Sequence, residues 1–152
     1  MKIYKTKKID DSLLQLLLLA DPSEKAIRKY LAEGECFVSV DGSRIIGTYV
    51  LMPRSNNAME LINIAVIGKE QGKGLGKLLL KHAIKEARRS GAKRLFVGTG
   101  NSSLGQLAFY QKAGFRMTKI IKGYFLKGYD KPIFENGIQC VDMVRMEMEL
   151  NN

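Results

Sequence analysis

A run of glycines followed by leucines, VIGKEQGKGLGKLLLKHA at residues 66–83, has the residue types needed to bind an anion. The leucine-rich part predicts a helix. The first amides of a helix have no partner within it and lie at the positive end of its dipole. Glycine lets such a backbone come close to phosphate oxygens and adopt a positive φ angle. We therefore predict that the amides at this helix start bind a phosphate or a diphosphate.

Two common phosphate-binding loops do not match the spacing of these glycines. A Walker loop has GxxxxGK followed by Ser or Thr, and this segment has neither that spacing nor the hydroxyl that binds magnesium. A dinucleotide-binding loop has GxGxxG early in a series of βα units. The glycines here read GxGxG and follow strands that we predict to be antiparallel. Nucleotide hydrolysis and NAD binding are therefore not expected.

The pattern that does match is QGKGLG at residues 71–76, which has the form [QR]xxGx[GA]. It stands between a strand-like NIAV and the leucine-rich helix, and it resembles the pyrophosphate-binding loop of the GNAT superfamily of acyl-CoA N-acyltransferases. A second block, AFYQKAGFRM, resembles that family's later helix-to-strand signature, with Tyr110, Gly114 and Phe115 in register. Two motifs at this separation make the resemblance specific, and the order of elements matches along the chain.

The resemblance implies acetyl-CoA (coenzyme A) as the cosubstrate, no metal, and a set of cofactor-binding residues. The backbone of residues 64–66 would pair with the pantetheine arm like an extra strand, and the amides of residues 71–77 would hold the pyrophosphate. The family has an asparagine seven residues before the tyrosine. Here Ser103 stands at that position, with Asn101 two residues upstream, and both stay candidates. The implied residues are Ile64, Ala65, Val66, Gln71, Gly72, Lys73, Gly74, Leu75, Gly76, Lys77, Asn101, Ser103 and Tyr110.

Acyl transfer to an amine first requires an amine without its extra proton. Populating the neutral form of a lysine-like amine, whose pKa is near 10.4, requires about 4.6 kcal/mol at pH 7, so a general base helps. Glu60, on the strand that the resemblance places beside the thioester, is the candidate base, directly or through water. The alternative is a solvated or ion-paired glutamate without a chemical role. A backbone N–H near Val66 would donate to the developing oxyanion.

Tyr110 stands where the family places the hydroxyl that assists the departing thiolate. A thiol has a pKa near 8.5 and a phenol one near 10, so full proton transfer is uphill by about 2 kcal/mol. A hydrogen bond that stabilises the thiolate is therefore the expected role. The alternative is that Tyr110 only packs beside the cofactor. We predict Tyr110 and Glu60 as the catalytic residues of an N-acetyltransferase that acts by direct transfer in a ternary complex.

The charge distribution leaves two other hypotheses open. The net charge is +10 over 152 residues, and residues 61–128 alone have a net charge of +12, from 14 Lys and Arg against 2 Asp and Glu. Such a field attracts a polyanion, which can be a phosphorylated cofactor or a nucleic acid. Aromatic residues make up only 8% of the chain, which disfavours a nucleic-acid-binding module that stacks bases. A non-catalytic acyl-CoA sensor is the remaining alternative.

The cysteines, the histidine and the first apolar run indicate whether this protein has a metal site, a disulfide or a membrane-spanning helix. Cys36 and Cys140 match no metal-ligand or disulfide spacing, and the single histidine, His82, lies at helical spacing from leucines. We expect buried structural cysteines, an interior histidine, no metal site and a cytoplasmic location. The run LLQLLLLA follows two aspartates and is too short to span a bilayer, so we expect a buried helix and no membrane association.

The elements that must position these residues follow from the hydrophobic pattern. Helices are expected at residues 11–20 (capped by Asp11 or Ser12), 22–33, 74–90 and 102–113, the last with Ser103 and Gln106 as a capping box. Strands are expected at residues 2–8, twice within 35–53 around a turn at Asp41-Gly42, and at 58–67, 93–100, 115–126 and 140–150. The expected class is α+β: three layers in a GNAT-like domain over residues 1–152, with a mixed sheet of about seven strands whose fourth and fifth are parallel and splayed.

The acceptor is a small-molecule or peptide amine that the sequence does not identify. We expect the first two helices and an irregular segment, KGYDKPIFENGIQ at residues 127–139, to select it. Tyr129, Asp130 and Glu135 of this segment are candidates to meet a cationic amine. The closing strands leave a free edge, at which we expect a homodimer to form.

Overall fold

The alternating apolar residues at 35–54 form a β-hairpin in the computed structural model, which describes residues 2–150. The described chain divides into two compact units, residues 2–93 with Leu150 and residues 94–149. Met1, Asn151 and Asn152, which the expected domain includes, lie outside the described residues. Because the two units are described separately, a single domain over residues 1–152 stays a prediction.

The first unit contains an antiparallel sheet in the order β1-β2-β3-β4. Strands β2 and β3 meet at Asp41 and Arg44, with Gly42 at a φ of 65° in the turn, so the predicted hairpin and three-stranded meander are confirmed. The strands are β1 (Lys2–Thr6), β2 (Glu35–Asp41), β3 (Arg44–Arg54) and β4 (Ala58–Val66).

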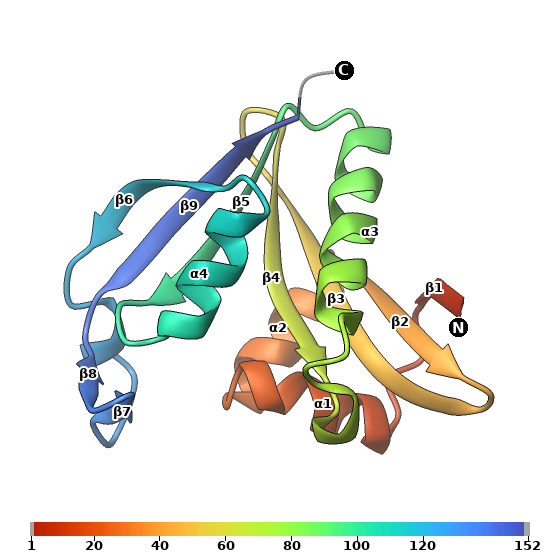
Figure 1. Ribbon diagram of the computed structural model, residues 1–152, viewed down its shortest axis with the longest axis horizontal. Helices are drawn as coiled ribbons and strands as arrows, with labels where there is room; N and C mark the ends of the chain where they lie inside the picture. The colour runs from red at the N-terminus through yellow and green to blue at the C-terminus, as the bar shows by residue number, and fades with distance from the viewer. Residues whose placement is uncertain (1, 151–152) are drawn as a thin grey trace. The chain divides into compact units, whose positions relative to one another are not determined.

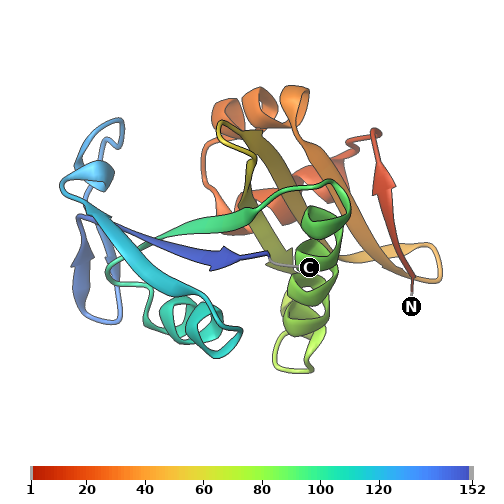
Figure 2. The same ribbon diagram turned by 90° about the horizontal axis from the view of Figure 1, so that it is seen from above.

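Helices α1 (Asp11–Ala20) and α2 (Glu24–Glu33) lie on one face of this sheet, and α3 (Leu75–Arg89) lies on the other (Figures 1 and 2). The α1 side is a core of fully buried residues that includes Leu13, Leu17, Ile27 and Val50. Burying one such side chain stabilises the fold by about 2 kcal/mol. This core confirms that the LLQLLLLA run forms a buried helix.

Helix α1 spans the predicted residues 11–20 but has a different cap, and α2 begins two residues later than predicted. Asp10, not Asp11 or Ser12, caps α1, because its Oδ1 accepts the amide proton of Leu13 at 2.9 Å. Helix α2 begins at Glu24, with Ser23 as its cap, rather than at residue 22. In both cases the residue whose side-chain oxygen reaches the amide three positions later defines the start.

The second unit contains an antiparallel sheet in the order β5-β9-β6, with α4 on one face (Figure 2). Its elements are β5 (Arg94–Gly100), α4 (Leu104–Lys112), β6 (Arg116–Ile121), the 3-10 turn η2 (Tyr124–Leu126), β7 (Ile133–Glu135), β8 (Ile138–Cys140) and β9 (Met143–Glu149). Strand β6 forms the edge of this sheet, and a homodimer at that edge stays a prediction.

The prediction of an irregular segment at residues 127–139 is wrong in part, because β7 and β8 pair as a short hairpin. Asn136 and Gly137 form the turn with φ angles of 56° and 73°. Two consecutive positive φ angles are typical of the tight turn that an Asn-Gly pair favours. That dipeptide is the signal that could have predicted the hairpin.

None of the helices at residues 2–150 is long and apolar enough to cross a bilayer.

Candidate active site

The glycine loop adopts backbone conformations that favour glycine. Gly72 and Gly74 have φ angles of 80° and 86°. A Cβ atom added at either position would meet no atom within 4 Å. The requirement for glycine at these two positions is therefore one of backbone conformation rather than of space.

Helix α3 begins at this loop with free amides. Gly74 is the cap residue and supplies no side-chain oxygen, and the first helical hydrogen bond runs from the amide of Leu78 to the Gly74 carbonyl at 3.1 Å. The amides of Leu75, Gly76 and Lys77 consequently have no acceptor within the helix. The first turn contains no acidic residue, so the positive end of the dipole is not neutralised there.

The loop is tied to the end of β4 by a side chain that the sequence pattern singled out. The Gln71 side-chain amide donates to the Val66 carbonyl at 3.0 Å. Lys73 lies 3.6 Å from Glu70 within the loop, at a largely exposed position. The predicted residues at 64–66 and 71–77 thus belong to one continuous strand, loop and helix start in the first unit. Together they form a surface of backbone amides with nearby lysines, which suits an anion.

Strand β4 is interrupted by a bulge between Glu60 and Ile64. Val50 of β3 faces Asn63, and the next residue of β3, Leu51, faces Leu61, so Ile62 is the extra residue. A bulge bends a strand and redirects the side chains on either side of it. The strand with the predicted base and the predicted pantetheine contacts is therefore bent between them.

Glu60 is held by an arginine. The Arg54 Nη2 lies 2.7 Å from Glu60 Oε1, and its Nε donates to the same oxygen at 2.9 Å. The Glu60 side chain is 17% exposed, so water and ligands reach it only in part. Arg54 and Glu60 are diagonal neighbours in the β3–β4 register, and this pairing is the signal that could have predicted the contact.

Tyr110 is buried on α4, with only 4% of its surface exposed. Its ring packs against Phe109 and Phe115, with ring centres 5.2 and 5.6 Å away. Burial raises the pKa of Tyr110 well above the usual value of a phenol. Among residues 2–150 no group accepts a hydrogen bond from its hydroxyl, which leaves a protonated donor without a protein partner.

Asn101 is hydrogen-bonded to residues 139–142, the segment just before β9. Its Oδ1 accepts the amide protons of Val141 and Asp142 at 2.8 and 2.9 Å, and its Nδ2 donates to the Gln139 carbonyl at 3.0 Å. One N–H of the side chain is left for any other contact. The Asn101 side chain therefore serves first to hold residues 139–142 in place.

Ser103 does not form the predicted capping box with Gln106. Its hydroxyl donates to Glu135 Oε1 at 2.7 Å, and Ser102 donates to the same oxygen at 3.1 Å. The Gln106 side chain accepts from Thr99 instead. The capping prediction is wrong because partners distant along the chain satisfy both side chains. Asn101, Ser103 and Tyr110 all lie in the second unit.

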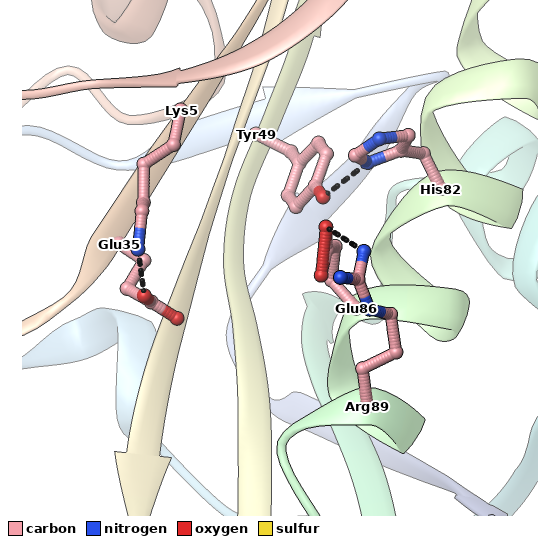
Figure 3. Close-up of polar contacts among 6 residues, drawn as sticks. All are labelled: Lys5, Glu35, Tyr49, His82, Glu86 and Arg89. Carbon is pink, nitrogen blue, oxygen red and sulfur yellow. Dashed lines mark hydrogen bonds and ion pairs between the residues drawn. The ribbon is translucent and has the colours of Figure 1, made fainter.

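His82 is half-buried, not fully interior as predicted, and it has a hydrogen-bond partner. Figure 3 shows it on α3 pointing toward Tyr49, whose hydroxyl lies 2.7 Å from His82 Nδ1. Desolvation lowers the pKa of His82, and burial raises that of Tyr49, so both groups favour their neutral forms. Phe37 stacks on Tyr49 with ring centres 4.8 Å apart. We therefore assign this cluster to the packing of α3 on the sheet.

Comparison with known proteins identifies the family and supports the fold. Residues 9–115 match the family model described as the acetyltransferase (GNAT) family. YvbK, an N-acetyltransferase of Bacillus subtilis strain 168, is 46% identical over 150 residues, which cover 99% of this chain and 97% of YvbK.

Solved structures show the same similarity. An acetyltransferase of Bacillus subtilis in complex with CoA is 46% identical, with a TM-score of 0.96 over 99% of both chains. A GNAT family acetyltransferase from Elizabethkingia anophelis with acetyl-CoA bound is 46% identical, with a TM-score of 0.94 over 98% of this chain and 97% of that one. These matches along the chain confirm the predicted GNAT-like α+β fold.

Proposed function

Because this chain belongs to the acetyltransferase (GNAT) family of acyl-CoA-dependent enzymes, we propose that it moves the acetyl group of acetyl-CoA to a primary amine by direct transfer in a ternary complex. One observation carries the proposal. The loop before α3 has two glycines at positive φ and three amides without helical acceptors. Such a loop fits the diphosphate of a coenzyme A molecule.

In this proposal the first unit binds the cofactor. The amides from Gln71 to Lys77 hold the diphosphate, and Lys73 and Lys77 add positive charge beside it. The backbone of Ile64, Ala65 and Val66 pairs with the pantetheine arm, and an N–H near Val66 donates to the oxyanion. The relatives from Bacillus subtilis and Elizabethkingia anophelis, solved with CoA and acetyl-CoA, support this assignment.

Two residues are proposed for the chemistry, one acting on the incoming amine and one on the departing thiolate. Glu60, oriented by Arg54, accepts the proton that the ammonium must lose before the nitrogen forms its bond to the acetyl carbon. The carbon–sulfur bond then breaks, the nitrogen releases its second proton to water, and the Tyr110 hydroxyl donates a hydrogen bond to the departing thiolate. None of residues 2–150 accepts a hydrogen bond from that hydroxyl, which supports this role because the donor is available.

Binding of acetyl-CoA tests the proposal directly. At a concentration 100 times its Kd, the ligand should stabilise the protein by about 2.7 kcal/mol. For a chain of this size that corresponds to a rise in Tm of roughly 5 to 10 °C, measured by differential scanning fluorimetry. An unchanged Tm together with no heat of binding in titration calorimetry would contradict the proposal.

Glu60→Gln tests the proposed base. We expect kcat/KM for the amine to fall about tenfold at pH 7, with a smaller loss above the pKa of the amine, where the acceptor is already neutral. The Kd of acetyl-CoA should not change. Glu35→Gln is the matched control, because it also removes a strand glutamate from an ion pair, 2.7 Å from Lys5 (Figure 3). If Glu60→Gln and the wild type have equal kcat/KM at every pH, Glu60 is not the base and serves only as an ion-pair partner of Arg54.

A further inference from the structure

The β7–β8 hairpin lies beside the start of α4 within the second unit (Figure 1). Glu135 Oε1 accepts the hydroxyl protons of Ser102 and Ser103 at 3.1 and 2.7 Å. Asn136 Nδ2, in the turn of the hairpin, donates to the Ser102 carbonyl at 2.9 Å. Two adjacent residues of the hairpin therefore hold the two residues that precede α4.

The base of this hairpin is fixed without the help of Glu135. The Asn101 side chain holds residues 139–142, and its backbone amide donates to the Asp142 carbonyl at 3.0 Å. Strands β7 and β8 also pair with each other along residues 133–140. We therefore expect the hairpin to keep its place when the Glu135 side chain is removed, so that the loss falls on the start of α4.

Helix α4 depends on such contacts because it buries little of its own surface. Of its nine residues, Leu104–Lys112, only Tyr110 is buried. The side chain of the cap residue, Ser103, bonds no amide of α4, and the first turn contains no acidic residue. Apart from the hydrogen bond between Thr99 and Gln106, the Glu135 carboxylate is what stabilises the positive end of this helix dipole.

The start of α4 influences where the Tyr110 hydroxyl lies. Ser103 and Tyr110 are separated by two helical turns, about 10 Å along the axis. A tilt of about 5° at Ser103 moves the Tyr110 backbone by about 1 Å, and a displacement of that size can lower a rate about a hundredfold. Among residues 2–150 no group bonds this hydroxyl, so its position follows from the packing of the ring and the course of α4.

We propose that Glu135 is a positioning residue for Tyr110, which it aligns through the two serine hydroxyls and helix α4. The proposal rests on the proposed role of Tyr110 in the transfer reaction. In this assignment Glu135 serves the alignment of α4 rather than the binding of a cationic amine, because its Oε1 already accepts two hydroxyl protons.

A contact that only stabilised the second unit would have a different effect on activity. Its loss would lower kcat by the same factor whether or not the Tyr110 hydroxyl is present. The loss of a positioning residue lowers kcat only while the hydroxyl that it aligns is there. A double-mutant cycle of Glu135 and Tyr110 therefore separates the two roles.

The experiment measures kcat by thiol release, and the Kd of CoA by calorimetry, for each single variant and for the double variant. We expect Glu135→Ala to lower kcat about tenfold and to leave the Kd of CoA within about twofold of the wild type. In the Tyr110→Phe background the same substitution should lower kcat less than about twofold. Glu147→Ala is the matched control, because it removes a strand glutamate of the same unit from an ion pair, 3.7 Å from Arg94, and it should leave kcat unchanged in both backgrounds.

A second variant keeps the test decisive if Glu135→Ala does not fold. Glu135→Gln keeps a side-chain oxygen that can accept both serine hydroxyls, so we expect a loss in kcat of about two- to threefold, again only when the Tyr110 hydroxyl is present. Losses that multiply in the double variant, an unchanged kcat in Glu135→Ala, or a Kd of CoA that changes more than kcat would each overturn the inference.

The inference and the transferase proposal fail separately. A Tyr110→Phe variant with the kcat of the wild type would overturn the inference and leave the transferase proposal standing. If acetyl-CoA binds and no amine releases thiol, the transferase proposal fails, and hydrogen–deuterium exchange decides the role of Glu135. Faster exchange at residues 107–110 in Glu135→Ala than in Glu147→Ala supports the alignment of α4, and equal exchange overturns it.

Discussion

Tyr110→Phe is expected to lower kcat about a hundredfold while leaving the Kd of CoA within about twofold of the wild type. The substitution removes one hydroxyl and keeps the ring that packs against Phe109 and Phe115. Because no described residue accepts a hydrogen bond from that hydroxyl, its loss should leave the free energy of unfolding nearly unchanged. Steady-state kinetics, calorimetry with CoA and a thermal melt measure the three quantities.

The raised pKa of Tyr110 adds a prediction about pH. A phenol whose pKa is raised stays protonated throughout the neutral and moderately alkaline range, so the donor is present at every working pH. The wild-type kcat should therefore show no decline from loss of this proton below about pH 10. The same shift makes the phenol a weaker acid, so a hydrogen bond to the thiolate, rather than full proton transfer, is the expected contribution.

Tyr124→Phe is the control for Tyr110→Phe. It removes a hydroxyl from an exposed tyrosine of the same unit and should leave kcat unchanged. If Tyr110→Phe behaves like Tyr124→Phe, Tyr110 only packs beside the cofactor. A wild type that binds acetyl-CoA but releases no thiol with any amine would instead favour the sensor hypothesis, because a sensor has no turnover to lose.

Gly74→Val is expected to weaken CoA binding about a hundredfold. Gly74 has a φ of 86°, which a β-branched residue adopts only with strain, so the loop must shift to accommodate valine. A shift at the cap misaligns the amides of Leu75, Gly76 and Lys77, and the loss of three hydrogen bonds of about 1 kcal/mol each corresponds to roughly a hundredfold in Kd. Titration calorimetry with CoA measures this loss.

Gly68→Val is the matched control for this prediction. Gly68 begins the 3-10 turn ahead of the loop without a positive φ angle, and a Cβ atom there would meet nothing within 4 Å. We expect its Kd for CoA to stay within about twofold of the wild type. Equal effects of the two substitutions would show that the strain at Gly74 is not what aligns the amides. If the Kd for CoA is unchanged in Gly74→Val, the start of α3 is not part of the cofactor site.

Local signals predicted most of the elements. The boundaries of α1, the turn at Gly42 and the start of α3 after Gly74 follow from apolar periodicity and from the conformational freedom of glycine. The capping box at Ser103 failed, although its local pattern is correct, because Glu135 is a charged acceptor and competes for the same hydroxyl. The β7–β8 hairpin was missed, because a strong turn signal at Asn136-Gly137 was outweighed by the short strands around it.

The features of the candidate site are likewise of two kinds, those set by residues close in sequence and those set by contacts between distant residues. By itself, the sequence determined the glycine loop, the helix that follows it and the helix on which Tyr110 lies, because these depend on residues within a few positions of one another. Only the tertiary structure decided that Arg54 holds Glu60, that Asn101 holds residues 139–142 in place and that the Arg145 guanidinium packs on the Phe96 ring. Those contacts depend on strand register, and a shift of one residue would turn each side chain to the other face of its sheet.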